Sequence, residues 1–210
     1  MKKSILTTVF FLATLFAMAQ TQFEQGMNKA FELWKTGNTT EASAMFERIA
    51  SVEKNNWLPN YYIALVNTTT AFQVLKEKQK VTALLDKAQA SLDIEFAKNP
   101  NNAEILALQA LIYTAWVAFD PMTNGMKLSG KVMETYAKAE KIDPNNPRVI
   151  FGKAEFEIGG ARYFKQDTKP MCAQIDKAIT LFSTFKPETI YHPNWGLDRA
   201  LQVQKECNAK

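Results

Sequence analysis

The side chains that could perform chemistry in this chain are few: one histidine, His192, and two cysteines, Cys172 and Cys207. A catalytic or zinc site would have to use the single imidazole, and the carboxylates show no recognisable metal-binding spacing around it. We therefore interpret His192 as a turn residue that packs beside Trp195. The sequence predicts no catalytic residue, no metal site and no cofactor, and it favours a protein that is not an enzyme.

Two other pairs of residues have types that chemistry could use. Glu155 and Glu157 are two residues apart, so on a helix they point to different sides and cannot act together on one bond. We interpret them as surface charge. Gly159 and Gly160 lack the surrounding pattern of a phosphate-binding loop, and we expect them to allow close helix packing or a kink.

The start of the chain has the three-part layout of a secretory signal peptide: two lysines, an apolar run, and small residues ending at Ala19. We predict cleavage between Ala19 and Gln20, which separates a signal peptide (1–19) from a mature domain (20–210). The apolar run is shorter than the roughly 20 residues that span a bilayer, so no stable membrane anchor is expected after cleavage. We expect the mature protein in the periplasm or outside the cell.

Charge and composition narrow the class of partner. The chain has 25 Lys and Arg against 21 Asp and Glu, and loss of the two lysines of the signal peptide leaves the mature domain nearly neutral. Such a balance gives no reason to expect nucleic acid or an anionic membrane as a partner. The 47% of apolar residues can supply the core of one domain.

Almost every segment after residue 21 has helical periodicity, because apolar residues return at intervals of three and four. Prolines lie where this periodicity places helix boundaries. The sequence therefore predicts an all-α fold of about four helical pairs and a C-terminal helix. The expected segments are 27–34 with 42–49, 58–75 with 82–98, 103–119 with 128–141, 148–165 with 172–185, and finally 194–206.

An internal repeat punctuates these pairs. The sequence over 98–102, Lys-Asn-Pro-Asn-Asn, is nearly copied over 142–146 as Ile-Asp-Pro-Asn-Asn, and each copy ends one helix and precedes another. An asparagine in this position can cap the following helix, and Asn101 with Glu104 has the spacing of a capping box.

These segments resemble the tetratricopeptide repeat (TPR) family. The matching positions are Tyr136, Ala139 and Pro144 at the end of a second helix, Leu106, Ala110 and Tyr113 in a first helix, Gly37 to Ala42 with Phe46 at a turn, and Ala88, Leu92 and Pro100. The two prolines that end second helices are 44 residues apart where the family repeat is about 34, so we expect an insertion around residues 120–130. The resemblance implies stacked antiparallel hairpins, a TPR-like α-solenoid.

The same resemblance implies a concave groove that binds a protein or peptide partner, whose identity the sequence does not give. The aromatic and polar residues expected to line it are Tyr61, Tyr62, Asn67, Gln73, Gln109, Trp116, Arg162 and Tyr163. Most of the aromatic residues could instead fill the core between hairpins. Two other functions stay open: a small-ligand protein or enzyme with a pocket near His192, Trp195 and residues 120–130, and a self-assembling structural component of the cell envelope.

The two cysteines are expected to form a disulfide. Folding the last two expected helices antiparallel about residue 190 brings Cys172 and Cys207 together, because each is 17 or 18 residues from that bend. An exported protein meets the oxidising conditions in which such a bond persists. A redox or nucleophilic cysteine is the alternative, but no CxxC motif or positioned histidine accompanies either residue.

Overall fold

The structure is a computed structural model that describes residues 22–209. The expected signal peptide and its cleavage site between Ala19 and Gln20 lie outside the described residues. All regular secondary structure in the described range is helical, which confirms the predicted all-α class. Residues 22–35 are helical and are followed by α2 (Thr39–Val52), α3 (Leu58–Gln73), α4 (Lys78–Lys98), α5 (Ala103–Phe119), α6 (Pro121–Ile142), α7 (Pro147–Tyr163), α8 (Lys169–Thr184) and α9 (Leu197–Asn208).

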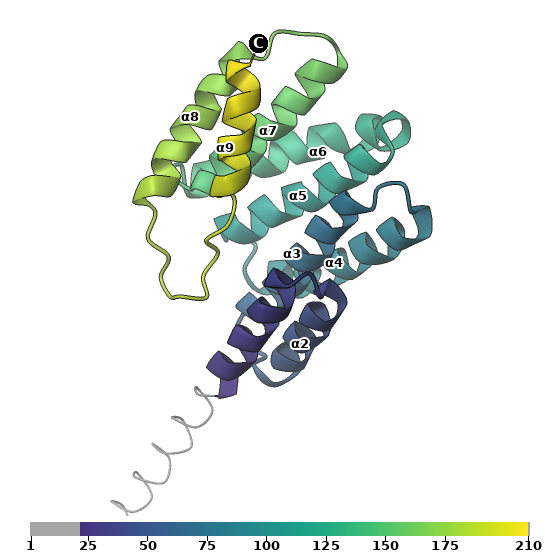
Figure 1. The fold of residues 1–210 in the computed structure, drawn as a ribbon, viewed down its shortest axis with the longest axis vertical. Coiled ribbons are helices and arrows are strands. Elements are labelled where there is room, and N and C mark those ends of the chain that lie inside the picture. Colours follow the sequence, from purple (N-terminus) through teal and green to yellow (C-terminus); the bar gives the residue numbers. More distant parts are fainter. Residues whose placement is uncertain (1–21, 210) are drawn as a thin grey trace, which may run out of the picture.

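Neighbouring helices pack as hairpins that stack along the molecule (Figure 1). Helices α3 and α4, α5 and α6, and α7 and α8 form successive pairs, and each first helix also packs on the first helix of the next pair. Helix α9 lies against α8. This is the expected stack of TPR-like hairpins with an added C-terminal helix.

The two near-copies of the repeat cap helices in the same way. Asn102 accepts hydrogen bonds from the backbone N–H groups of Glu104 and Ile105, at 2.9 and 3.3 Å. Asn146 does the same for Arg148 and Val149, at 3.0 and 3.3 Å. The cap of α5 is therefore Asn102 and not Asn101, and Asn102 has the extended backbone that is typical of a cap.

The segment around residues 120–130, where the sequence predicts an insertion, is helical. Helix α6 begins at Pro121, two turns earlier than the predicted start at Leu128. Asp120 caps the helix through the backbone N–H of Thr123 at 3.1 Å, and proline suits the first helical position. The extra residues of the long repeat thus lengthen the helices of the third hairpin.

One long-range contact distinguishes the fold from a simple stack. The loop between α8 and α9, residues 185–196, returns to the N-terminal hairpin (Figure 1). The backbone oxygen of its Tyr191 accepts a hydrogen bond from the Tyr62 hydroxyl at 2.8 Å, and the Tyr191 hydroxyl lies 3.2 Å from the backbone oxygen of Glu24. The last hairpin therefore contacts the first helices of the chain directly.

Candidate functional site

His192, near which the alternative pocket was predicted, contacts three neighbouring side chains. The Nδ1 of His192 lies 2.8 Å from the Thr189 hydroxyl, its Nε2 lies 3.1 Å from a carboxylate oxygen of Glu188, and its ring packs edge-on against Trp57. Trp195 donates a hydrogen bond from its indole nitrogen to the Tyr61 hydroxyl at 2.9 Å. Both residues hold the loop against the core, and His192 lies in a turn as predicted, but the ring on which it packs is Trp57 and not Trp195.

Half of the residues expected in a groove are buried: Tyr61, Tyr62, Asn67 and Gln109. The Asn67 amide donates to the Ser43 hydroxyl at 2.9 Å, and the amides of Gln109 and Gln89 bond each other in both directions at 2.8 Å. These side chains join helices and leave no open surface for a ligand. Trp116 is half-buried, whereas Gln73, Arg162 and Tyr163 are exposed.

Burial also governs the tyrosine acidities. Loss of hydration raises the pKa of the Tyr61 hydroxyl well above its usual range, and nearby Glu104 raises it further while Arg148 lowers it. The hydroxyl is therefore a neutral hydrogen-bonding group, which suits a structural role.

A buried ion pair lies beside these tyrosines. The guanidinium of Arg148, at the start of α7, is 1% exposed and bonds both carboxylate oxygens of Glu104 on α5 at 2.6 to 3.0 Å. Its carbon Cζ lies 4.3 Å from the centroid of the Phe185 ring, and its Nη1 has no hydrogen-bond partner among the described residues. The ion pair connects the third and fourth hairpins, whereas the sequence predicted only a capping role for Glu104.

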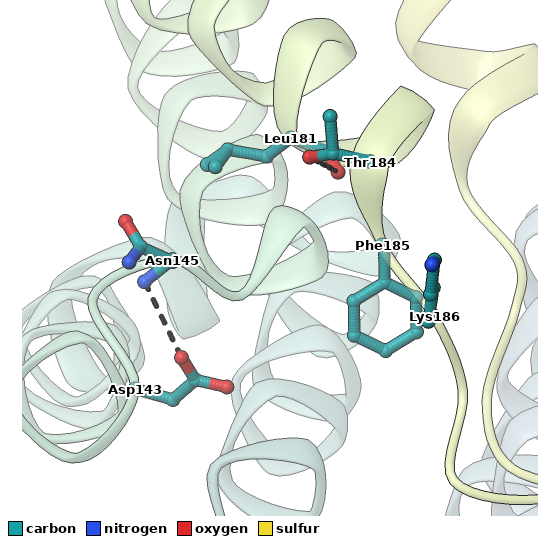
Figure 2. Close-up of a pocket in the computed structure, with 6 residues that line it drawn as sticks. All are labelled: Asp143, Asn145, Leu181, Thr184, Phe185 and Lys186. Carbon is teal, nitrogen blue, oxygen red and sulfur yellow. Dashed lines mark hydrogen bonds between the residues drawn. The ribbon is translucent and has the colours of Figure 1, made fainter.

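A hollow of about 440 Å³ lies between the α6–α7 turn and the end of α8 (Figure 2). Asp143, Asn145, Leu181, Thr184, Phe185 and Lys186 line it. None of the residues predicted for the groove belongs to this lining. Its volume is within the range of small-molecule pockets, but its apolar wall is limited to Leu181 and the Phe185 ring that covers Arg148.

Four exposed apolar side chains form a second candidate site, the Tyr163 patch: Met122, Met126, Tyr163 and Phe164, which are 72, 89, 60 and 69% exposed. The Tyr163 hydroxyl lies 3.5 Å from the Met122 sulfur, which joins the α7–α8 turn to the start of α6. Phe164 packs edge-on against the Tyr163 ring, and Met126 is one turn after Met122. Exposed apolar clusters of this kind mark binding surfaces.

Of the four residues in the Tyr163 patch, only Tyr163 was predicted from the sequence to bind a partner. Met122 and Met126 lie within the expected insertion, and the stack of the third and fourth hairpins is what brings them to Tyr163. Met122 and Met126 are four residues apart, a spacing that places both on one face of a helix. This spacing predicts a shared surface only if α6 is known to begin before Met122.

The described part of the chain shows neither a metal-binding cluster nor a membrane-spanning helix. No group of three or more His, Cys, Asp or Glu residues in residues 22–209 could hold a metal ion. Over the same residues, no helix combines the length and apolar character needed to cross a membrane.

The fold is similar to those of two solved proteins. The HusA haemophore from Porphyromonas gingivalis superposes with a TM-score of 0.69 at 22% identity, covering 89% of this chain and 93% of HusA. A thermophilic TPR protein from Thermus thermophilus superposes with a TM-score of 0.57 at 12% identity, covering 90% of this chain and 100% of the Thermus chain. No protein-family model and no curated protein matches the sequence. These likenesses confirm the TPR-like helical-repeat fold.

Proposed function

We propose that this chain is an exported, non-enzymatic binding protein whose Tyr163 patch holds a flat, amphiphilic ligand of the haem type. The carrying observation is the patch itself, in which two aromatic rings and two thioethers are exposed together at the junction of two hairpins. The similarity of the whole fold to a haemophore supports haem as the first ligand to test. The Cys172–Cys207 disulfide supports a site of action outside the cytoplasm.

The chemistry of the patch suits a porphyrin. Tyrosine and methionine are both haem-iron ligands in proteins, and the Tyr163 hydroxyl and the Met122 sulfur lie 3.5 Å apart. The Phe164 ring offers an exposed face on which a flat macrocycle can stack. Lys127 and Lys165 are exposed next to Met126 and Phe164 in the chain and can pair with carboxylates at the ligand's edge.

Haem titration of the mature chain, residues 20–210, tests this function. We expect saturable binding with a shifted Soret band, and about tenfold weaker binding for Phe164→Ala, because loss of one stacking ring removes on the order of 1.4 kcal/mol. Ile190→Ala is the matched control, since Ile190 is exposed in the α8–α9 loop outside the patch. Titration with metal-free protoporphyrin measures stacking alone, because this ligand has no iron for Tyr163 to bind. Absence of saturable binding, or equal losses in the control, would contradict the proposal.

A second candidate function is binding of a protein or peptide, which the TPR-like fold itself supports. Trp116 is half-buried and packs against Phe119, one turn before the patch, so it could extend a partner's contact surface from Tyr163. A pull-down from the envelope fraction of the source cell tests this function. A partner lost with Trp116→Ala and Tyr163→Ala but retained with Ile190→Ala would support it.

A further inference from the structure

Three hairpin turns follow one another along one edge of the stack (Figure 1). Each turn is taken together with the adjoining helix ends: the α3–α4 turn as residues 74–80, the α5–α6 turn as residues 119–127 and the α7–α8 turn as residues 163–169. The contact of Tyr163 with Met122 joins the last two turns. The first two are also neighbours: the pKa of Asp120 is lowered mainly by the hydrogen bond from the Thr123 backbone and further by Lys78 of α4.

This edge is basic although the mature domain is nearly neutral. Its turns carry six exposed lysines, Lys76, Lys78, Lys80, Lys127, Lys165 and Lys169, against three acidic residues, Glu77, Asp120 and Asp167. Within the described part of the chain, only Lys80 of the six has an ion pair, 3.5 Å from Glu77. The turns on the opposite edge, taken with their adjoining helix ends as residues 50–60, 96–105, 140–149 and 182–199, carry six Lys and Arg against six Asp and Glu.

Four of the exposed apolar side chains, those of the Tyr163 patch, lie on the basic edge, whereas others such as Val52 and Ile190 lie outside it. Two of the three turns contribute the patch, and Lys127 and Lys165 directly follow Met126 and Phe164 in sequence. We propose that these three turns, the lysine edge, dock the protein on the surface of an anionic lipid bilayer. Lysines would pair with lipid headgroups, and in the ligand-free protein the side chains of the Tyr163 patch would enter the interfacial region, where aromatic side chains are favoured.

The arrangement favours an extended surface over a small anion. Packed helices lie roughly 8 to 10 Å apart, so lysines spread over three hairpins cannot all reach one phosphate or carboxylate. A bilayer presents many anionic groups in one plane. It also accepts protruding side chains without the matched hollow that a folded partner would need. The hollow lined by Asp143 and Phe185 is on the opposite edge, at the α6–α7 turn.

Vesicle co-sedimentation of the ligand-free mature chain tests the inference. We expect binding to phosphatidylcholine vesicles with about 30% phosphatidylglycerol, little binding to pure phosphatidylcholine, and loss of binding in about 1 M salt. Each lysine near an anionic surface contributes about fivefold, so Lys76→Gln/Lys78→Gln/Lys80→Gln should bind on the order of 100-fold more weakly. Phe164→Ala should weaken binding at constant charge.

The control is Lys54→Gln/Lys141→Gln/Lys186→Gln, which removes the same charge from exposed positions outside the lysine edge. Equal losses in the two triple variants, or equal binding to neutral vesicles, would overturn the inference. Binding to polyglutamate but not to anionic vesicles would also overturn it and assign the edge to an acidic protein. The Lys76, Lys78 and Lys80 positions are outside the Tyr163 patch, so haem titration without vesicles should be unchanged in that variant and keeps the two proposals separate.

Discussion

At the scale of single residues, Gly152 lies where the packing of two helices leaves no space for a larger side chain. A Cβ atom built there would lie 2.7 Å from Cζ of Tyr136, a fully buried ring on α6. We expect Gly152→Ala to lower the free energy of unfolding by about 1 to 3 kcal/mol through overpacking. Gly159→Ala on the same helix meets nothing within 4 Å and should raise it by about 0.4 to 1 kcal/mol. Urea unfolding measures both, and equal effects would contradict this account.

The glycines also show how far the packing role of a single residue can be predicted from the sequence. We expected Gly159 and Gly160 to permit close packing, but neither has a neighbour that an added Cβ would meet. Gly152 attracted no such expectation because its contact, Tyr136, is 16 positions away and on another helix. Periodicity identifies a buried face, whereas the identity of the opposing side chain depends on how two hairpins stack.

At the scale of elements, the C-terminal helix depends on a covalent link that the sequence did predict. The structure confirms the Cys172–Cys207 disulfide between α8 and α9, which closes 35 residues. Two ion pairs assist it, Arg199 with Glu155 at 2.6 Å and Arg162 with Glu206 at 2.8 Å. The disulfide was predictable because the two helices are antiparallel and similar in length. The start of the first helix therefore lies beside the end of the second, where the two cysteines are.

We expect Cys172→Ser/Cys207→Ser to lose roughly 3 to 4 kcal/mol of stability, because the unfolded chain is no longer constrained. Hydrogen exchange should increase first in α9, since surface ion pairs alone contribute little. Reducing agent should bring the native protein to the stability of the variant and leave the variant itself unchanged. If α9 exchanged at the native rate in the variant, its side-chain packing and not the disulfide would hold it.

The boundaries of elements were predicted less well than their existence. Helices α4 and α6 begin at Lys78 and Pro121, four and seven residues before the expected starts. The first turns of both helices carry few apolar residues, so apolar periodicity does not reveal them. Half of the residues predicted for the groove are buried for a related reason. The sequence alone does not decide whether Tyr61 and Tyr62 face a groove or the core. In the structure the α8–α9 loop returns over both residues and hydrogen-bonds to their hydroxyl groups.

At the scale of the whole molecule, that loop changes how stability should be distributed. In a simple repeat stack each hairpin contacts only its neighbours, so local damage spreads to the adjacent repeat. Here Tyr191 packs against Phe23 and Phe31 of the first helix, with ring centroids 5.5 and 6.2 Å away. The last hairpin and the first helix are thus coupled across more than 150 residues.

We therefore expect Tyr191→Ala to release the opposite end of the chain. Loss of a buried aromatic side chain costs about 3 to 5 kcal/mol, and amide exchange should accelerate over residues 22–35 as well as in the α8–α9 loop. Phe182→Ala is the matched control, because Phe182 is also aromatic and buried but packs within the cluster of α7, α8 and α9. Its effect should stay in those helices. If both variants loosened only the C-terminal hairpin, the molecule would behave as an open solenoid and the returning loop would be a passive cover.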